Sequence, residues 1–499
     1  MFLRLKNPFR VFSKINLYFQ VVRRSHGKAR GGRTKDCLIK EQCGHAGWSG
    51  ASKGEVTFER AFGLNMAGFK FFRLGLLLSF LLFFPSHTLA RIYIDINTPS
   101  VRKFNIAIPD FKNLNVNDKH PELAGKLSSV ISTDLDLSGY FNPMDKGAFL
   151  EEDNSSLTLE NIRFKDWSVI GAELLLKASF TCTGKTLEVQ ARLFDVFWGK
   201  QILGKRISGD ISQYRYMMHR FGDEVIRALT GHESIFLSKL AFVGNASGNK
   251  EIYMCDYDGH NLRRFTEDKS IALLPRWSPD GKKLIYNSYK EGSPMLYMGN
   301  ISGEASKRIS TRSGLNIGAS WAPSGNKMAL TLSRKGNPDI FIIDLNGTIV
   351  KRLTNHWGID VSPAFAPNGK KVAFVSNRSG FPQIYILDLI NGAEERLTFE
   401  GKYNTSPSWS SLNRIAFVSR NDQYFDICTI DPDGRRFRRL TEHQGDNEDP
   451  CWSPDGRYII FCSTRAKRNN LYIMTANGQS QRKIINLSGG DCTSPSWAP

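Results

Sequence analysis

The residues whose types could do chemistry do not form a complete catalytic set in this sequence. A Gly-x-Ser-x-Gly phrase, typical of hydrolase nucleophiles, occurs at Gly50–Gly54, but no strand pattern precedes it and no helix pattern follows it. His232 and Glu233 begin like a zinc-protease helix, yet Phe236 stands where the second histidine is required. Neither phrase predicts an active site, so we expect a protein that is not an enzyme.

Acidic turns and cysteines do not indicate a site either. Asp256–Gly259 and Asp431–Gly434 each carry two carboxylates but lack the further ligands of a calcium loop, so both are interpreted as hairpin turns. Cys451 and Cys462 flank a turn on adjacent predicted strands, and the sequence leaves open whether they pair or stay free. No metal and no cofactor is expected, although the sequence leaves open whether a cation occupies a central channel.

The second half of the chain is organised by one phrase, PRWSPDGKK at Pro275–Lys283, which recurs in recognisable form. Successive aromatic anchors of this phrase lie 43 to 45 residues apart, at Trp277, Trp321, Phe365, Trp409, Trp452 and Trp497. A period in the low forties with several short strands per unit is typical of a β-propeller. Residues 233–499 are therefore predicted to form an all-β propeller of six blades.

The order of the repeats predicts how the ring closes. Three alternating strands lie between successive anchors, the first triplet has no anchor before it, and the last anchor, at Pro495–Pro499, has no triplet after it. The anchor phrase is expected to be the innermost strand, so the C-terminal copy would complete the first blade and remove open sheet edges. The aromatic anchors are expected to pack between blades, and deletion of the last six residues should destabilise the ring.

The first 90 residues predict export. Residues 1–65 lack apolar periodicity, whereas residues 66–90 combine Lys70 and Arg73, the apolar run Leu74–Phe84 and a small-residue end, as in a signal peptide cleaved between Ala90 and Arg91. A membrane anchor would need about 20 apolar residues. We expect translation to start at Met66, with residues 1–65 a non-translated or disordered extension.

Most of the net charge of +19 lies in this leading part, and about +8 remains from residue 91 onward. That excess is too small to indicate a nucleic-acid-binding surface.

Residues 91–232 predict a small α+β domain. Arg91–Ile96 and Arg102–Phe111 alternate like strands, and an apolar helical stripe follows Pro121. A hairpin is predicted from residues 167–182 and 186–196, and a final helix from about Ser212 to Leu229, ending at Gly231.

The loops that lead into each anchor break the repeat, and the topology should gather them at one rim of the propeller. Interface-type side chains occur there, with a local acidic cluster: His356, Trp357, Tyr403, Asn404, Asp446, Glu448 and Asp449. Ordinary solvated loops remain the alternative interpretation for each of these residues.

From Arg91 to Pro499 the sequence resembles the TolB family of periplasmic propeller proteins of the Tol-Pal system. The resemblance rests on the order of the domains, on Leu229–Gly231, and on the repeated phrases W-S-P-D-G and R-L-T at Trp277, Trp452, Arg352, Arg396 and Arg439. It implies a periplasmic, monomeric, non-enzymatic scaffold that reaches membranes only through its partners, the lipoprotein Pal and the inner-membrane protein TolA. Such a scaffold supports outer-membrane integrity and constriction at cell division.

The resemblance also assigns partner segments by position. The TolA-type segment would comprise Arg91, Ile92, Tyr93, Ile94, Asp95 and Ile96. The Pal-type loops would comprise Leu315, Asn316, Gly318, His356, Trp357, Asp360, Val361, Tyr403, Asn404 and Asp446. Two departures from the family pattern concern the fourth anchor, which lacks Pro-Asp-Gly after Trp409, and Leu315, where a polar side chain is expected. A secreted propeller domain of a hydrolase or of a ligand-binding protein is the alternative function.

Overall fold

The computed structural model describes residues 102–115, 120–150, 157–310, 312–334, 337–420, 423–485 and 487–499. The predicted signal peptide, its cleavage site and the TolA-type segment lie outside these residues, so those three interpretations stay predictions. No helix in the described ranges combines the length and the apolar character that crossing a bilayer requires.

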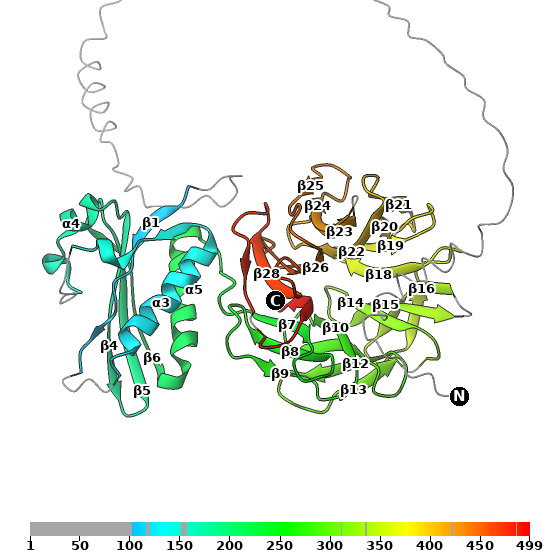
Figure 1. Ribbon diagram of the computed structural model, residues 1–499, viewed down its shortest axis with the longest axis horizontal. Helices are drawn as coiled ribbons and strands as arrows, with labels where there is room; N and C mark the ends of the chain where they lie inside the picture. Colours follow the sequence, from blue (N-terminus) through cyan, green and yellow to red (C-terminus); the bar gives the residue numbers. More distant parts are fainter. Residues whose placement is uncertain are drawn as a thin grey trace, which may run out of the picture. The chain divides into compact units, whose positions relative to one another are not determined.

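The N-terminal domain is a sheet with two long helices on one face (Figure 1). The strand order is β3-β1-β4-β5-β6, with β2 pairing separately with β4. The strands are β1 (Phe104–Ala107), β2 (Lys112–Asn113), β3 (Phe141–Pro143), β4 (Leu174–Thr183), β5 (Thr186–Asp195) and β6 (Lys200–Asp210). The helices are α3 (Leu123–Ser138), α4 (Phe164–Val169) and α5 (Tyr214–Thr230), with short 3-10 turns at Lys146–Ala148, Leu159–Asn161 and Ile211–Gln213.

Two predictions for this domain are confirmed, one is corrected, and one strand was not predicted. The helix after Pro121 buries its apolar stripe, and α5 ends at Gly231, which adopts the left-handed conformation of a helix C-cap. The segment from Trp167 to Val169, predicted as strand, lies in the helix α4, where Trp167 packs into a small hydrophobic cluster, and the strand begins only at Leu174. Strand β6 was missed because most of its side chains are exposed or half-buried, so it shows no run of core residues.

The propeller has six blades, each a four-stranded antiparallel sheet. The inner strands are β10 (Ala272–Trp277), β14 (Asn316–Trp321), β18 (Asp360–Phe365), β22 (Tyr403–Trp409), β26 (Asn447–Trp452) and β30 (Cys492–Trp497). The second strands are β7 (Lys239–Gly244), β11 (Lys283–Ser288), β15 (Lys327–Arg334), β19 (Lys371–Ser376), β23 (Ile415–Arg420) and β27 (Tyr458–Ser463). The third strands are β8 (Glu251–Asp256), β12 (Met295–Asn300), β16 (Asn337–Asp344), β20 (Gln383–Asp388), β24 (Phe425–Ile430) and β28 (Asn470–Thr475). The outer strands are β9 (Arg263–Arg264), β13 (Lys307–Ser310), β17 (Ile349–Arg352), β21 (Glu394–Arg396), β25 (Arg438–Arg439) and β29 (Arg482–Lys483).

The C-terminal strand closes the ring, as the sequence predicts. Strand β30 pairs antiparallel with β7, with Trp497 opposite Leu240 and Cys492 opposite Gly244. The first blade is therefore built from both ends of the propeller sequence, with β30 as its innermost strand.

The anchors pack between blades, which confirms their structural role. Trp277, Trp321, Trp452 and Trp497 are buried. The indole N–H groups of Trp321 and Trp452 donate to backbone carbonyls of the preceding inner strand, at 3.3 and 3.0 Å.

The fourth anchor, Trp409, is an exception. It is only half-buried, and its indole N–H donates to Asn413 in its own turn, at 3.0 Å. Asn413 adopts the left-handed backbone conformation there, the role that glycine has in the Pro-Asp-Gly turns.

The cysteine question is settled by the strand register. Cys451 lies opposite Ile460 and Cys462 opposite Glu448, so the two cysteines are not cross-strand neighbours. Both are free.

Candidate functional site

The loops that break the repeat lie at one rim of the propeller, which we call the loop rim. In each antiparallel blade, the loop that enters the inner strand and the turn between the second and third strands lie at the same end. Hydrogen bonds join these segments within and between blades. Ile359 N–H donates to the Asn377 side chain of its own blade at 2.7 Å, and Asn404 N–H donates to the Pro382 carbonyl of the preceding blade at 2.9 Å. The loop rim is thus a set of interlocked segments.

Four of the predicted Pal-type residues are buried within this rim. Asn316, Asp360 and Asn404 occupy equivalent positions at the start of their inner strands, and each is 0% exposed. The Asn316 and Asn404 side chains donate to the carbonyls of Arg312 (2.7 Å) and Glu400 (2.8 Å). Val361 is also buried. The buried polar side chains therefore fix the loops from inside, and their neighbours form the outer surface.

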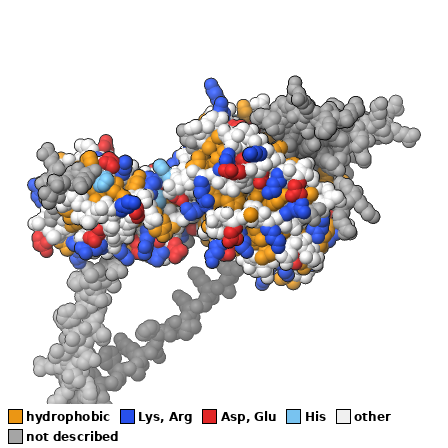
Figure 2. Space-filling view, turned by 90° about the horizontal axis from the view of Figure 1, so that it is seen from below, with side chains coloured by type: hydrophobic (Ala, Val, Ile, Leu, Met, Phe, Trp, Pro, Cys, Tyr) orange, Lys and Arg blue, Asp and Glu red, His pale blue; other side chains and the backbone are white. Residues whose placement is uncertain are grey.

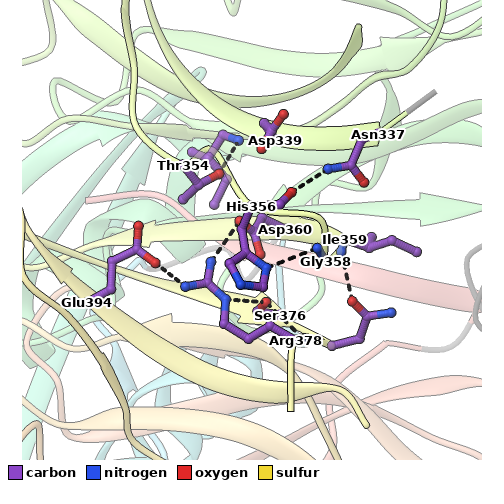
Figure 3. Close-up of polar contacts among 12 residues, drawn as sticks. Asn337, Asp339, Thr354, His356, Gly358, Ile359, Asp360, Ser376, Arg378 and Glu394 are labelled. Carbon is purple, nitrogen blue, oxygen red and sulfur yellow. Dashed lines mark hydrogen bonds and ion pairs between the residues drawn. The ribbon is translucent and has the colours of Figure 1, made fainter. Parts of the chain in front are cut away.

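Trp357 is the most exposed of the predicted residues, with 72% of its surface accessible. Its loop is fixed on both sides: the Asn337 side chain donates to the His356 carbonyl at 2.5 Å, and Gly358 N–H donates to His356 Nδ1 at 3.0 Å (Figure 3). The His356 ring lies 5.2 Å from the Trp357 ring. Trp357 is thus a large apolar side chain held out from an ordered loop.

The remaining predicted residues are half-buried, namely Leu315, Gly318, His356, Tyr403 and Asp446. Three exposed aromatic residues of the same rim were missed: Phe399 (72% exposed), Phe381 (45%) and Tyr424 (43%). Phe399 lies four residues before Tyr403, the first predicted residue of its loop. Arg396 lies against the Phe399 ring, 4.8 Å from its centroid. These three residues could have been found in the sequence as aromatic side chains in otherwise polar loops.

We call Trp357, Phe381, Phe399 and Tyr424 the rim aromatics. They come from two consecutive blades, β18–β21 and β22–β25. Exposed aromatic side chains of this kind are enriched at protein–protein interfaces.

Arg378 braces the loop that carries Trp357 (Figure 3). Its guanidinium donates to Asp360 at 2.9 Å, to Ser376 at 2.9 Å and to Glu394. Its carbon Cζ lies 5.4 and 5.0 Å from the ring centroids of Phe374 and Tyr385.

Burial determines the charges at this brace. Burial raises the pKa of Asp360, and the hydrogen bonds from Ser376 and Arg378 only partly offset that effect. For Arg378, burial opposes the charge, but Glu394 and Asp360 outweigh it and raise the pKa. Asp360 is therefore a buried carboxylate whose ionised form depends on its arginine.

A second arginine repeats the arrangement with neutral partners. Arg465 donates to Asn447 at 3.0 Å, to Gln481 at 2.8 Å and to Ser463 at 2.9 Å, and it lies 4.6 Å from the Tyr472 centroid. The shared sequence pattern is Ser-x-Arg at the end of the second strand. The same arginine arrangement therefore occurs in two blades. Its partners include carboxylates in the blade next to the Trp357 loop, and they are neutral in the other.

The predicted acidic cluster lies at the start of inner strand β26. Asp449 accepts from the Ser494 backbone N–H (3.1 Å) and hydroxyl (3.0 Å) of the neighbouring inner strand, and Asp446 accepts from Phe425 N–H at 3.2 Å. Burial, followed by the nearby Asp449 and Asp446 charges, raises the pKa of Glu448 to about 8. Within the described residues, no three His, Cys, Asp or Glu side chains are grouped to hold a metal ion.

The surface charge is mixed. Figure 2 shows one side of the molecule, where basic, acidic and apolar side chains are interspersed. Such a surface favours specific contacts with a protein over general attraction to a polyanion.

Comparison with known families covers both domains. Residues 226–499 match the model of the TolB beta propeller domain, and residues 92–202 match that of the TolB amino-terminal domain. The crystal structure of TolB from Acinetobacter baumannii has a TM-score of 0.71 and 29% sequence identity, covering 82% of this chain and 100% of that one.

Curated relatives share a substantial part of the sequence. The Tol-Pal system protein TolB of Desulfosudis oleivorans is 42% identical over 216 residues, which cover 43% of this chain and 49% of the relative. The corresponding protein of Geobacter sulfurreducens is 36% identical over 193 residues, covering 39% of this chain and 44% of the relative. The matched segments thus span about half the length of these relatives. Because the propeller model alone matches more than half of the sequence, the chain belongs to the TolB family.

Proposed function

We propose that this protein is a periplasmic, non-enzymatic interaction scaffold of the Tol-Pal system. The name shared by its relatives, Tol-Pal system protein TolB, supports this assignment. In our proposal the loop rim binds a Pal-like lipoprotein of the outer membrane. The observation that carries it is the set of exposed rim aromatics on loops fixed by buried hydrogen bonds, since rigid aromatic side chains lose little entropy on binding.

The second partner in this proposal is a TolA-like inner-membrane protein, bound by Arg91–Ile96. This segment alternates apolar and polar residues, as expected of a strand added to another sheet. It directly follows the predicted cleavage site, so it would lie at the start of the exported chain. The protein would act as a monomer, reach both membranes through its partners, and support outer-membrane integrity and constriction at division.

The proposed function is tested by pull-down with the exported chain, residues 91–499, and with the same chain lacking residues 91–100. We expect the deletion to abolish binding of a purified TolA-type domain and to leave binding of a Pal-type domain intact, because the loop rim is untouched. Loss of both interactions, or of neither, would contradict separate partner sites.

Replacement of two rim aromatics, Trp357→Ala with Phe399→Ala, should raise the Kd for a Pal-type domain by about 10- to 100-fold, since each truncation removes an exposed interface side chain. Isothermal titration calorimetry measures the change. The matched control is Ile390→Ala with Leu412→Ala: both residues are exposed and lie in turns at the opposite rim. Equal weakening by both pairs would argue against the loop rim as the binding surface.

A further inference from the structure

Five polar side chains meet where the N-terminal domain contacts the propeller; three of them are buried, and Arg215 and Asp258 are half-buried. Asp134 on α3 and Arg215 and His219 on α5 come from the first domain, and Tyr257 and Asp258 come from the β8–β9 turn of the second. Asp134 and Tyr257 are 0% exposed and His219 is 3% exposed. We call these residues the interdomain ion cluster. The sequence did not predict it, because Asp258 was interpreted only as a turn residue.

His219 lies between two carboxylates, one from each domain. Its Nδ1 is 2.9 Å from an Asp134 oxygen, and its Nε2 is 3.4 Å from an Asp258 oxygen. The Tyr257 hydroxyl donates to Asp134, and the Arg215 guanidinium pairs with Asp258. Every charged member of the cluster therefore contacts a member of opposite charge.

With Asp134 and Asp258 both ionised, the cluster is neutral only when the imidazole is protonated. Two carboxylates and one guanidinium leave one negative charge, and an uncompensated charge in a buried interface is strongly unfavourable. An imidazolium at His219 supplies the missing positive charge and presents an N–H to each carboxylate. The outer strand β29 adds a separate ion pair between the domains, Arg482 with Asp136 at 2.8 Å.

The pKa shifts of His219 and Asp258 agree with this balance. Burial opposes a charge on His219, but the contacts with Asp134 and Asp258 outweigh it and raise the pKa to about 9. Burial likewise opposes the charge on Asp258, but His219 and Arg215 lower its pKa well below the usual value. Burial raises the pKa of Asp134, while His219 and Tyr257 act in the opposite direction.

We propose that the proton carried by His219 is an electrostatic lock that holds the N-terminal domain against the propeller. The lock is closed throughout the neutral range, and any movement that separates α5 from the β8–β9 turn must break the ion pairs of Asp258 with His219 and Arg215. This inference concerns the coupling of the two domains and is independent of which partners bind.

The sign of the pH dependence follows from the raised pKa. The contribution of His219 to domain docking is fully present below about pH 6.5, its unfolded pKa. It is lost as the pH rises through about 9.

Nuclear magnetic resonance of the exported chain with ¹⁵N-labelled histidine tests the protonation directly. We expect one imidazole, absent from the His219→Gln spectrum, to keep the imidazolium signature until the pH approaches about 9. The matched control is His260→Gln, because His260 is exposed in the same turn. A neutral tautomer at His219 near pH 7 would overturn the proposal. The titration is recorded on the unaltered protein, and the variant serves only to assign the signal.

A charge-balance cycle tests the lock itself. Phe236, in the segment that joins the domains, is 2% exposed, so chymotrypsin can cleave after it only when the domains separate. We expect His219→Gln, which leaves a negative excess, to accelerate this cleavage about 100-fold. Adding Asp134→Asn restores neutrality and should return the rate to within about tenfold of the parent. If the two substitutions instead accelerate cleavage additively, His219 has only a packing role and the proposed lock is refuted.

Discussion

Deletion of the last six residues, 494–499, will reduce the free energy of unfolding by more than about 4 kcal/mol and remove most of the cooperativity of the transition. The deletion removes Trp497, which is buried and donates its indole N–H to Ser238 at 2.7 Å. Burial of a tryptophan contributes about 4 to 6 kcal/mol, a large share of the roughly 5 to 15 kcal/mol that stabilises a domain. The loss also uncovers the hydrogen-bonding edge of β7.

Urea unfolding followed by tryptophan fluorescence and circular dichroism measures this effect. The control is removal of Pro499 alone, because this residue is exposed and follows the last strand. We expect the control to unfold like the full chain and the six-residue deletion to be aggregation-prone at its new edge. A deletion that unfolds at the same urea concentration as the control would refute closure of the ring by β30.

The propeller could be predicted from the sequence because the same inner-strand phrase, with its aromatic residue, occurs once in each of the six blades. Each inner strand needs an aromatic residue to pack between blades, so the spacing of Trp277, Trp321 and their equivalents reports the blade count. Helix α3 was equally accessible, since its apolar stripe faces the sheet. Strand β6 was not, because its stability comes from pairing with β5 and packing against α5.

The candidate site could be predicted only in part. Breakdown of the repeat located the loop rim, but it could not separate side chains that face solvent from those that fix the loop. Asn316 and Asn404 look like interface residues in sequence and are fully buried, whereas Phe399 was not among the predicted residues and is exposed. Polarity alone does not determine the direction of a side chain, because a buried loop carbonyl also requires a polar partner.

The interdomain ion cluster could not be found from sequence. Asp134 and His219 are 85 residues apart, and Tyr257 lies 123 residues from Asp134. No local pattern connects them, since each occurs in an ordinary helix or turn. Their meeting is a consequence of domain packing, which depends on a hydrophobic core shared by both domains.

Replacement of Arg378 by methionine will reduce the free energy of unfolding by about 3 to 5 kcal/mol, because it leaves Asp360 as a buried carboxylate without its cation. Arg465→Met is the matched control: the same brace is removed, but its partners Asn447 and Gln481 are neutral, so we expect a loss of only about 1 to 3 kcal/mol.

The charge on Asp360 gives the Arg378 prediction two further tests. Without Arg378 the pKa of Asp360 rises further above its unfolded value, so the variant should be less destabilised at about pH 5 than at about pH 8. Adding Asp360→Asn, which installs the residue found at this position in three other blades, should recover part of the lost stability. Urea unfolding at the two pH values measures both effects. If Arg378→Met and Arg465→Met cost the same and neither depends on pH, the charge on Asp360 does not stabilise the loop that presents Trp357.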